Sequence, residues 1–375
     1  MRAPDVIVIG GGIAGVSAAA EIAREARVTL LESEPALGYH STGRSAAIFI
    51  RNYGNATLRA LNALAEPVYA EASGISDTPL LSARGALTLA YAGEAHAFAD
   101  YCAEADGIER LSAREAAELV PILDPGPVEA AALEPDARDI DVDRALQGYA
   151  RLLRARGGRI VTGAPVTAIA REGGAWRVET PQGAERAAVI VNAAGAWADE
   201  VARLAGVAPL GLVPHRRSAA ILPPPGGRDV ARWPLFGSAT ETWYAKPDAG
   251  RLMVSPADED PVDPHDAWPD DMVLAEGLWR YEQAVTEAVE RVERSWAGLR
   301  SFLPDRTPAA GFAADAEAFF WLAGQGGYGV QTAPALAAIA RHLVTGGGAA
   351  PDPALLPALA PARLAAAGAR HAPEG

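Results

Sequence analysis

A run of glycines near the start of the chain has the spacing of a phosphate-binding loop. Gly10, Gly12 and Gly15 follow a short apolar stretch and precede strong helix formers. Glycines at these positions make a tight turn and let a pyrophosphate approach the positive end of the helix. A second apolar stretch ends at Glu32, whose carboxylate can accept hydrogen bonds from a ribose diol. The order of strand, loop, helix, strand and acid predicts that the chain binds a dinucleotide.

Three later segments extend this ligand site. Residues 38–47 place hydroxyls, glycines and a cation after the second strand, 191–197 end a further strand with small residues, and 324–332 open a helix with glycines. The N-terminus of that helix can stabilise the electron-rich edge of a reduced isoalloxazine ring. A glycine-rich loop without a ligand would explain any one segment. The three together favour a buried FAD over an exchangeable nicotinamide cofactor.

The predicted FAD site draws on segments far apart in the chain. Its members are Gly10, Gly12, Ile13, Ala14, Gly15, Glu32, Ser33, Ser41, Thr42, Gly43, Arg44, Ser45, Ala46, Ala47, Val166, Ala193, Gly195, Trp197, Arg300, Gly326, Gly327, Tyr328, Gly329, Val330, Gln331 and Thr332. His40 lies beside the phosphate-binding residues and could attach the flavin covalently, but we expect a non-covalent cofactor.

Composition narrows the class of protein. The chain has 375 residues, half of them hydrophobic, and a formal net charge of −14. Nucleic acid and anionic membrane surfaces both need a basic face, so neither is expected as a partner. The single cysteine, Cys102, excludes an internal disulfide, and no apolar run is long enough for a transmembrane helix. The first strand begins by Asp5, which leaves no room for a signal peptide, so we expect a cytoplasmic protein; peripheral membrane contact is left open.

The elements that position these residues follow from hydrophobic periodicity and from breakers. Helices are predicted at 56–72, from the capping box at 112–115 to before Pro121, at 144–156 capped by Asp143, at 276–294 and at 334–344. Strands are predicted at 84–91, 159–161, 176–180, 188–192, 218–222, 242–246, 252–254 and 319–323. The acidic, proline-rich stretch 258–271 contains His265 but lacks paired-histidine spacing, so we expect a solvated loop and no metal.

This order predicts an α/β protein in which a Rossmann-like FAD-binding domain is interleaved with an α+β substrate domain built on an antiparallel sheet. The FAD-binding domain is predicted at 1–83, 144–213 and 296–366. The substrate-binding domain is predicted at 84–143 and 214–295, and a flexible tail at 367–375.

The motifs resemble those of the FAD-dependent D-amino acid oxidase-like superfamily. Within it, the chain is most similar to bacterial D-amino acid dehydrogenases of the D-arginine dehydrogenase type. The segments 38–47, 193–198, 296–302 and 325–332 carry the resemblance. It implies oxidative deamination, in which hydride passes from the substrate Cα to flavin N5 and the imino acid is hydrolysed to a keto acid and ammonia.

The resemblance also assigns catalytic roles. It implies that Arg217 and Arg300 bind the substrate carboxylate, that Tyr53 and Tyr244 lie over the substrate, and that the Gly327 carbonyl receives the amine. Without it, Arg217 could belong to a surface basic cluster at 215–217, and the tyrosines could be ordinary packing residues. Arg300 stands between apolar neighbours, which makes a solvated charge a poorer explanation.

The side-chain pocket departs from the D-arginine type. Members of that type carry a glutamate where this chain has Ala86 and a histidine where it has Ile48. Since Ala86 cannot pair with a guanidinium, we expect Ile48, Ile50, Ala86 and Trp243 to form an apolar pocket for neutral or hydrophobic D-amino acids. Arg51 offers a rival, because it could pair with an acidic side chain.

Other functions compete with this interpretation. A sarcosine- or glycine-type amine oxidase would share the carboxylate clamp, and an FAD-dependent 2-hydroxy acid dehydrogenase would share the fold. A flavin-binding regulator without turnover is disfavoured because the two arginines and two tyrosines occur together. The sequence leaves the electron acceptor (oxygen, a quinone or a protein) and the oligomeric state open.

Overall fold

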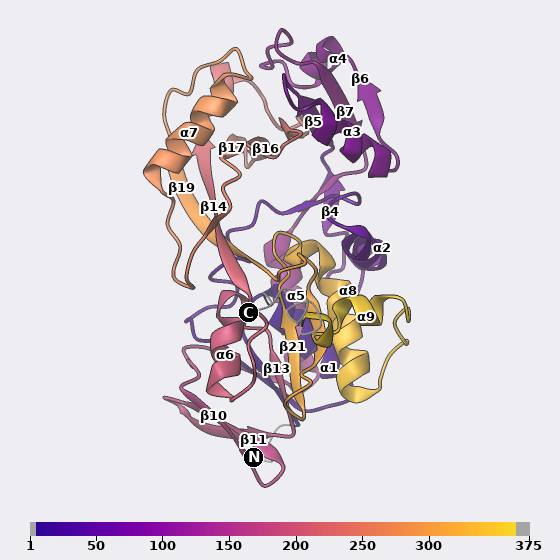
Figure 1. Ribbon diagram of the computed structural model, residues 1–375, viewed down its shortest axis with the longest axis vertical. Coiled ribbons are helices and arrows are strands. Elements are labelled where there is room, and N and C mark those ends of the chain that lie inside the picture. Colours follow the sequence, from indigo (N-terminus) through magenta and orange to yellow (C-terminus); the bar gives the residue numbers. More distant parts are fainter. Residues whose placement is uncertain (1–4, 365–375) are drawn as a thin grey trace, which may run out of the picture.

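The computed structural model describes residues 5–364 and has two parts, one built on a parallel sheet and one on an antiparallel sheet (Figure 1). The predicted fold class is confirmed. The domain boundaries stay predictions. The flexible tail predicted at 367–375 lies outside the described residues, as do the last two residues of the predicted segment 296–366.

The N-terminal strand forms the centre of the mostly parallel sheet, whose order is β20-β21-β13-β1-β2-β9. Its strands are β1 (Val6–Ile9), β2 (Val28–Leu31), β9 (Arg159–Val161), β13 (Val189–Asn192), β20 (Ala309–Phe312) and β21 (Phe319–Ala323). Val6 and Val8 of β1 pack into one hydrophobic core, and Ile7 and Ile9 into another. Both faces of this sheet are therefore covered, as its continuous apolar strands require.

Different layers cover the two faces. One core joins β1 to helices α1 (Ile13–Ile22), α2 (Ala56–Ala70), α5 (Val142–Ala155) and α8 (Gly329–Thr345). The other joins it to the antiparallel strands β10 (Ala168–Glu172), β11 (Ala175–Thr180) and β12 (Gly183–Ala187) and to α6 (Ala198–Leu204). The short helix α9 (Leu355–Leu359) packs near β20.

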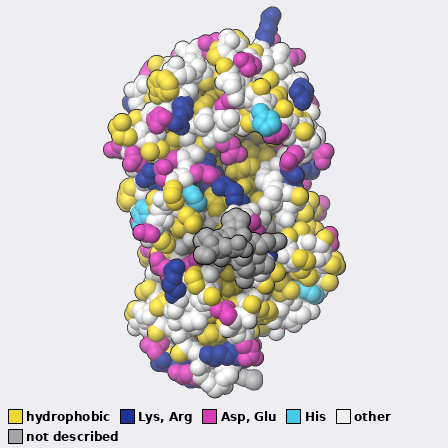
Figure 2. Space-filling model, in the orientation of Figure 1, with side chains coloured by type: hydrophobic (Ala, Val, Ile, Leu, Met, Phe, Trp, Pro, Cys, Tyr) yellow, Lys and Arg dark blue, Asp and Glu magenta, His cyan; other side chains and the backbone are white. Residues whose placement is uncertain are grey.

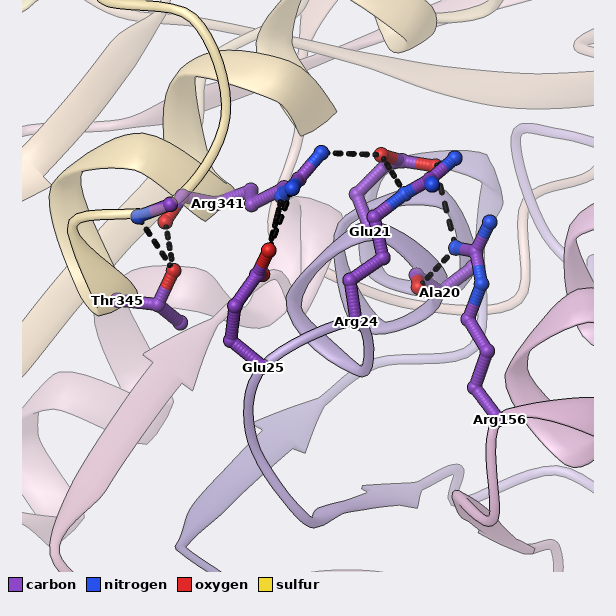
Figure 3. A network of polar contacts seen from close by, with 8 residues as sticks. Ala20, Glu21, Arg24, Glu25, Arg156, Arg341 and Thr345 are labelled. Atoms are coloured by element: carbon purple, nitrogen blue, oxygen red, sulfur yellow. Dashed lines mark hydrogen bonds and ion pairs between the residues drawn. The ribbon is translucent and has the colours of Figure 1, made fainter.

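An ion-pair network, here called the helix network, joins the ends of α1, α5 and α8 (Figure 3). Arg156 Nη1 donates to the Ala20 carbonyl at 2.5 Å and to Glu21 at 3.2 Å. Arg341 Nε donates to Glu25 at 3.0 Å, and Arg24 Nε donates to Glu21 at 2.8 Å. The network holds helices that are far apart in sequence against each other over the Rossmann core.

The antiparallel part is a nine-stranded sheet whose order is β18-β14-β17-β16-β15-β5-β7-β6, with β19 also paired to β14. Its strands are β5 (Ala86–Ala90), β6 (Glu109–Leu111), β7 (Ala130–Glu134), β14 (Val213–Leu222), β15 (Leu235–Ser238), β16 (Tyr244–Asp248), β17 (Arg251–Ser255), β18 (Asp260–Pro261) and β19 (Arg294–Phe302). The pair β15–β5 is parallel. In Figure 1, β14 and β19 run from this sheet toward the Rossmann part.

Smaller elements complete the antiparallel part and its junction. Helices α3 (Ala95–Glu104), α4 (Ala113–Leu119) and α7 (Asp271–Glu282) flank the large sheet. A small sheet of β3 (Ile48–Phe49), β8 (Arg138–Ile140) and β4 (Leu81–Ala83) lies beside the junction. The segment η1 (Gly195–Trp197) is a single 3₁₀ turn after β13.

Three local predictions need correction. The helix predicted at 276–294 ends at Glu282, because the following backbone bonds to 122–124 instead: Thr286 N donates to the Ile122 carbonyl at 2.7 Å. The cap of α5 is Asp141 rather than Asp143, since the Asp141 carboxylate accepts from Arg144 N at 3.0 Å. The last long helix begins at Gly329 rather than 334.

Acidic and basic side chains are interspersed over the face shown in Figure 2, without a broad basic field. Among the helices at 5–364, none has the length and apolar character needed to cross a membrane. The same residues contain no group of three or more His, Cys, Asp or Glu side chains placed to hold a metal ion.

Candidate active site

A cavity of about 470 Å³, here called the first cavity, lies where the two parts meet. Its floor is formed by the carboxyl ends of β1, β2 and β13, the edge at which open α/β sheets bind ligands. Predicted cofactor residues that line it are Gly10, Gly12, Ile13, Ala14, Glu32, Ser33, Ser41, Thr42, Arg44, Ser45, Ala46, Val166, Ala193, Gly195, Trp197, Arg300, Gly326, Gly327, Gly329 and Val330. Arg217 and Tyr244 line it as well.

The glycine loop has no room for side chains. A Cβ on Gly10, whose φ is +113°, would lie 2.3 Å from the Ala193 carbonyl oxygen. A Cβ on Gly15 would lie 1.9 Å from the Gly10 carbonyl oxygen, so Gly15 allows α1 to pack against the strand end without lining the cavity. The first turn of α1 is thereby exposed to a ligand in the cavity.

Glu32 is fixed at the cavity wall by backbone donors. Its Oε2 accepts from Gly11 N at 2.5 Å, and its Oε1 accepts from Glu34 N at 2.8 Å. A Cβ on Gly11 would lie 2.7 Å from Glu32 Oε2, so Gly11 also belongs to the site. The sequence analysis omitted Gly11, although its position in the glycine run was a usable signal.

The segment 38–47 connects the two parts of the molecule. Ser41 Oγ donates to the Leu299 carbonyl at 2.6 Å, and Arg44 Nη1 donates to the carbonyls of Ala267 and Ala297, both at 3.0 Å. Thr42 Oγ1 accepts from Ile13 N at 3.0 Å. Gly43 and Ala47, both predicted to bind the cofactor, do not line the first cavity.

His40 is already engaged within the protein. Its Nε2 lies 3.0 Å from Glu34 Oε1, and its ring centroid lies 4.6 Å from that of Trp197. Both rings line the first cavity. The non-covalent mode of flavin binding stays a prediction.

Sheet register brings the two predicted carboxylate-binding arginines together. Arg217 of β14 lies opposite Gly298 of β19, so Arg300, two residues further along β19, shares the same face. Tyr244 of β16 reaches that face two strands away, where it packs with Ala219 and Met253. A β-strand exposes alternate residues to each face, so three separate segments converge on one wall of the cavity.

Arg217 is buried and only partly satisfied. Its residue is 8% exposed, and its Nη2 donates to Glu259 Oε1 at 2.8 Å. Glu259 also accepts from Arg306 Nη2 at 3.0 Å. Burial raises the pKa of Glu259, but Arg306 and Arg217 together lower it by more, so the net shift is downward. One carboxylate is therefore shared by two arginines and remains ionised.

Arg300 keeps its charge in spite of burial. Burial lowers the pKa of Arg300, but Tyr53, Tyr244 and the nearby carboxylates raise it, and the net shift is upward. A Cβ on Gly327 would lie 3.1 Å from Arg300 Nη1, so the absence of a side chain at Gly327 lets the guanidinium pack directly against its backbone. The result is a fixed cation at the cavity wall.

Several buried polar atoms along the first cavity lack a hydrogen-bond partner within residues 5–364. They are Arg217 Nε, Ser301 Oγ and Gln325 Nε2, all from residues that line the cavity. Buried polar groups in proteins are nearly always satisfied, so these atoms indicate a polar ligand. Together with the glycine cradle, they fit a dinucleotide and a carboxylate bound in the same cavity. Ser301 and Gln325 were not among the predicted cofactor residues, because a serine after Arg300 on a strand and a glutamine between glycines carry no distinctive spacing.

Tyr53 lies close to the site but does not line the first cavity. Its ring is 4.8 Å from that of Tyr328, and it is partly buried. Burial raises the pKa of Tyr53, Glu241 adds to that rise and Arg300 opposes it. The phenol of Tyr53 is therefore neutral, and it lies close enough to Arg300 and Arg217 to interact with their charges.

The side chains of two predicted cofactor residues are hydrogen-bonded within the protein. Gln331 Nε2 donates to Asn62 Oδ1 at 2.8 Å, which ties α8 to α2. Thr332 Oγ1 donates to the Tyr328 carbonyl at 2.8 Å within the first turn of α8. Both side chains are buried, and neither they nor Tyr328 line the first cavity.

The residues predicted to form the side-chain pocket do not lie on the wall of the first cavity, and the pocket stays a prediction. Trp243 packs with Phe236 and Tyr281 in the core on the opposite face of its strand from Tyr244. Arg51 points outward, and its guanidinium donates to Glu66 at 2.6 Å.

The remaining pocket residues are also off the cavity wall. Ala86 is buried opposite Glu134 of β7, and neither Ile48 nor Ile50 lines the first cavity. The wall next to the clamp is formed instead by Ala219, Met253 and Trp296.

The stretch 258–271 was expected to be a solvated loop, but its first residue is buried. Asp258 is buried and accepts from Ser218 N at 2.6 Å and Ser218 Oγ at 2.8 Å. This anchor places Glu259 against Arg217. The acidic composition of the stretch suggested solvent exposure. That it also positions Glu259 beside Arg217 follows only from the pairing of 258–262 with β14.

Comparison with known proteins decides the family. A family model described as FAD dependent oxidoreductase matches residues 5–343. The chain belongs to this family. FAD is therefore its cofactor, and the glycine loop, Glu32 and the N-terminus of α8 are the residues that would hold it.

Individual relatives are more distant. The chain is 25% identical over 360 residues to glycine oxidase from Bacillus licheniformis, covering 91% of this chain and 93% of that protein. It is 38% identical over 113 residues to mitochondrial dimethylglycine dehydrogenase from Homo sapiens, but the match spans only 12% of that protein. The solved structure of L-proline dehydrogenase from P. horikoshii has a TM-score of 0.81 at 23% identity and covers 98% of this chain and 99% of that one. These matches support the family and the fold, and the narrower resemblance to D-arginine dehydrogenases stays a prediction.

Proposed function

We propose that this FAD-dependent oxidoreductase oxidises the Cα–N bond of an α-amino acid, with a preference for D-amino acids that have neutral side chains. The observation that carries the proposal is the pairing of Arg217 and Arg300 on one cavity wall, with a buried Nε of Arg217 left unsatisfied. Guanidinium groups bind carboxylates through fixed pairs of N–H donors, which orients the substrate as well as holding it.

The other residues of the wall complete a site for an amino acid. With the carboxylate held by the arginines, the phenol of Tyr244 covers the substrate, and the Gly327 carbonyl can accept a hydrogen bond from the amine. Bound FAD supplies the two-electron oxidant. Fixing the Cα–H bond toward the cofactor is the main contribution of these residues to rate.

The charge of the site supports a neutral side chain. Arg217, Arg300 and Arg306 face two nearby carboxylates, Glu259 and Glu241, so positive charge is in excess and a second cation on the substrate would be repelled. The carboxylate of Glu134, a buried residue opposite Ala86, accepts hydrogen bonds from the backbone N–H groups of Arg51 and Asn52. It is therefore not available to a basic side chain. The preference for the D-configuration rests on the resemblance described above.

A glycine or secondary-amine oxidase is the second candidate. The observation that favours it is the match to glycine oxidase, which extends over nearly the whole of both chains. It needs the same carboxylate clamp but no side-chain pocket. Oxygen, a quinone or a protein would each serve as electron acceptor, and a cytoplasmic location stays a prediction.

The test is anaerobic mixing of the purified protein with D- and L-amino acids, sarcosine and glycine, while the visible band of the oxidised flavin is followed. Bleaching by neutral D-amino acids and not by L-amino acids supports the proposal. Faster bleaching by glycine or sarcosine favours the second candidate. Clear preference for D-arginine or D-lysine contradicts the neutral side-chain preference.

A further inference from the structure

A second cavity, of about 540 Å³, lies beside the first. The two cavities are neighbours, because both are lined by Arg44, Ser45, Ala46, Met253 and Trp296. The second cavity has its own walls from the small sheet at the junction and from the turn between β16 and β17.

A buried charged cluster lies on those walls. Lys246 is 6% exposed, and its Nζ donates to Asp139 Oδ1 at 2.8 Å. Arg84 Nε donates to Asp139 Oδ2 at 2.7 Å, and Arg84 Nη1 donates to the carbonyls of Ala231 and Trp233 at 2.7 and 2.9 Å. Two cations therefore share one carboxylate, which leaves one positive charge uncompensated.

The other charges on the cavity do not balance this cluster. Arg44 is paired with Asp266 at 2.5 Å. Arg294, which lies over the Trp296 ring at 5.0 Å, and Asp248 also line the cavity, and their opposite charges add nothing to its net charge. A buried net charge is costly unless a counter-ion meets it, and the cavity supplies the space for one.

Lys246 has donors to spare. An ammonium group has three N–H bonds, and within residues 5–364 Asp139 is its one hydrogen-bond acceptor. Arg84, by contrast, uses its donors on Asp139 and two carbonyls. Met253, Trp296 and Ile140 give the same cavity an apolar side next to this ammonium group. Donors beside an apolar wall suit a molecule with one carboxylate and a small hydrocarbon body.

We propose that the second cavity is a binding site for a small organic monocarboxylate, which lies with its carboxylate on Lys246 and its apolar part against Trp296 and Met253. This site is separate from the Arg217–Arg300 clamp and does not depend on the reaction proposed above. One negative charge neutralises the cluster, whereas a doubly charged phosphate would overcompensate it.

The composition of the chain provides an unusually clean probe. Of its 33 basic Lys and Arg residues, Lys246 is the lone lysine. Protein labelled with carbon-13 at the lysine ε-carbon therefore gives one lysine resonance, which reports from inside the second cavity. The experiment titrates benzoate into the labelled, FAD-loaded full-length protein and follows that resonance.

The expected result is a saturable shift that persists in Arg217→Met, where the first site is impaired. Removing or adding one charge near the ligand changes its affinity by about tenfold. Arg84→Met should therefore weaken benzoate binding by about that factor, and Asp139→Asn should strengthen it. Arg228→Met, at an exposed arginine paired with Glu287, is the matched control and should change nothing.

Other results overturn the proposal. They are an unshifted lysine signal, a shift that disappears in Arg217→Met but survives in Arg84→Met, or inorganic phosphate and chloride binding as tightly as benzoate. If Arg84→Met does not fold, the opposite change expected for Asp139→Asn still decides the question. None of these readouts requires turnover, so they are independent of the proposed amino acid oxidation.

Discussion

Two networks of arginine and glutamate occur in this molecule, and they have different physical roles. In the helix network, Arg24, Arg156 and Arg341 meet Glu21 and Glu25 at the outer ends of three helices (Figure 3). At the first cavity, Arg217 and Arg306 share Glu259 beside Arg300.

The difference lies in one buried arginine with an unsatisfied donor, because Glu259 and Arg306, at 34% and 48% exposed, are as accessible as residues of the helix network. The side chains of Arg24 and Glu25 are 44% and 33% exposed, so water screens their charges. Arg217 is 8% exposed and keeps an unsatisfied Nε toward a cavity. The paired arginines of the helix network stabilise the fold only slightly, whereas the buried and incompletely satisfied Arg217 is suited to binding an anion.

The largest loss of activity is expected on replacement of Arg300. Replacing Arg300 with methionine should lower kcat/KM for the best amino acid by about a hundred- to a thousandfold, as expected when one partner of a buried charge pair is truncated. Steady-state kinetics and the flavin spectrum measure it. Equal activity in Arg300→Met and wild type would remove Arg300 from the clamp.

Arg217→Met should come next, with a loss of about a hundredfold expressed mainly in KM, because Arg300 remains on the cavity wall to hold the substrate carboxylate. Arg51→Met is the matched control, since Arg51 pairs with Glu66 away from the cavity. A larger loss of kcat/KM in Arg51→Met than in Arg217→Met would instead support the alternative in which Arg51 pairs with an acidic side chain of the substrate.

Glu259→Gln tests the shared carboxylate. The pKa of Glu259 is lowered in the folded protein, so its pairing stabilises the fold above the usual carboxyl pKa and is lost as pH falls through the lowered value. We therefore expect Glu259→Gln to be less stable than wild type at pH 7 and the difference to shrink on acidification. Urea unfolding at several pH values measures it, and a difference that grows toward low pH would contradict the pairing.

The smallest effect is expected in the helix network. Arg341→Met should lower Tm by less than about 4 °C and leave kcat and KM unchanged, because exposed ion pairs contribute about 0–1 kcal/mol. Calorimetry and steady-state kinetics test both parts. A change in KM would show that the two networks are coupled.

Local sequence was sufficient for the cofactor loop. Gly15 and Glu32 contact Gly10 and Gly11 within one strand–loop–helix–strand unit, so their spacing alone predicts how they pack. The same holds for the capping box of α4, where Ser112 and Glu115 exchange hydrogen bonds within one turn. Short-range contacts follow from sequence order because the intervening chain is too short to place them elsewhere.

The predicted side-chain pocket depends on contacts that local sequence does not specify. Trp243 and Tyr244 are adjacent in sequence, but a strand directs them to opposite faces, and the sequence does not say which face meets the cavity. Arg51 has the right charge near Tyr53, but Glu66 of α2 holds it outward. Such choices depend on partners from other elements.

The sequence by itself determined the dinucleotide loop, the cofactor class and the pairing of a parallel with an antiparallel sheet, because each follows from local periodicity and from glycines within one unit. Only the tertiary structure decided that Glu259 is shared by Arg217 and Arg306, and that Lys246 and Arg84 meet at Asp139. These contacts join residues many positions apart, and sheet register, which no short stretch of sequence specifies, sets the distance between them.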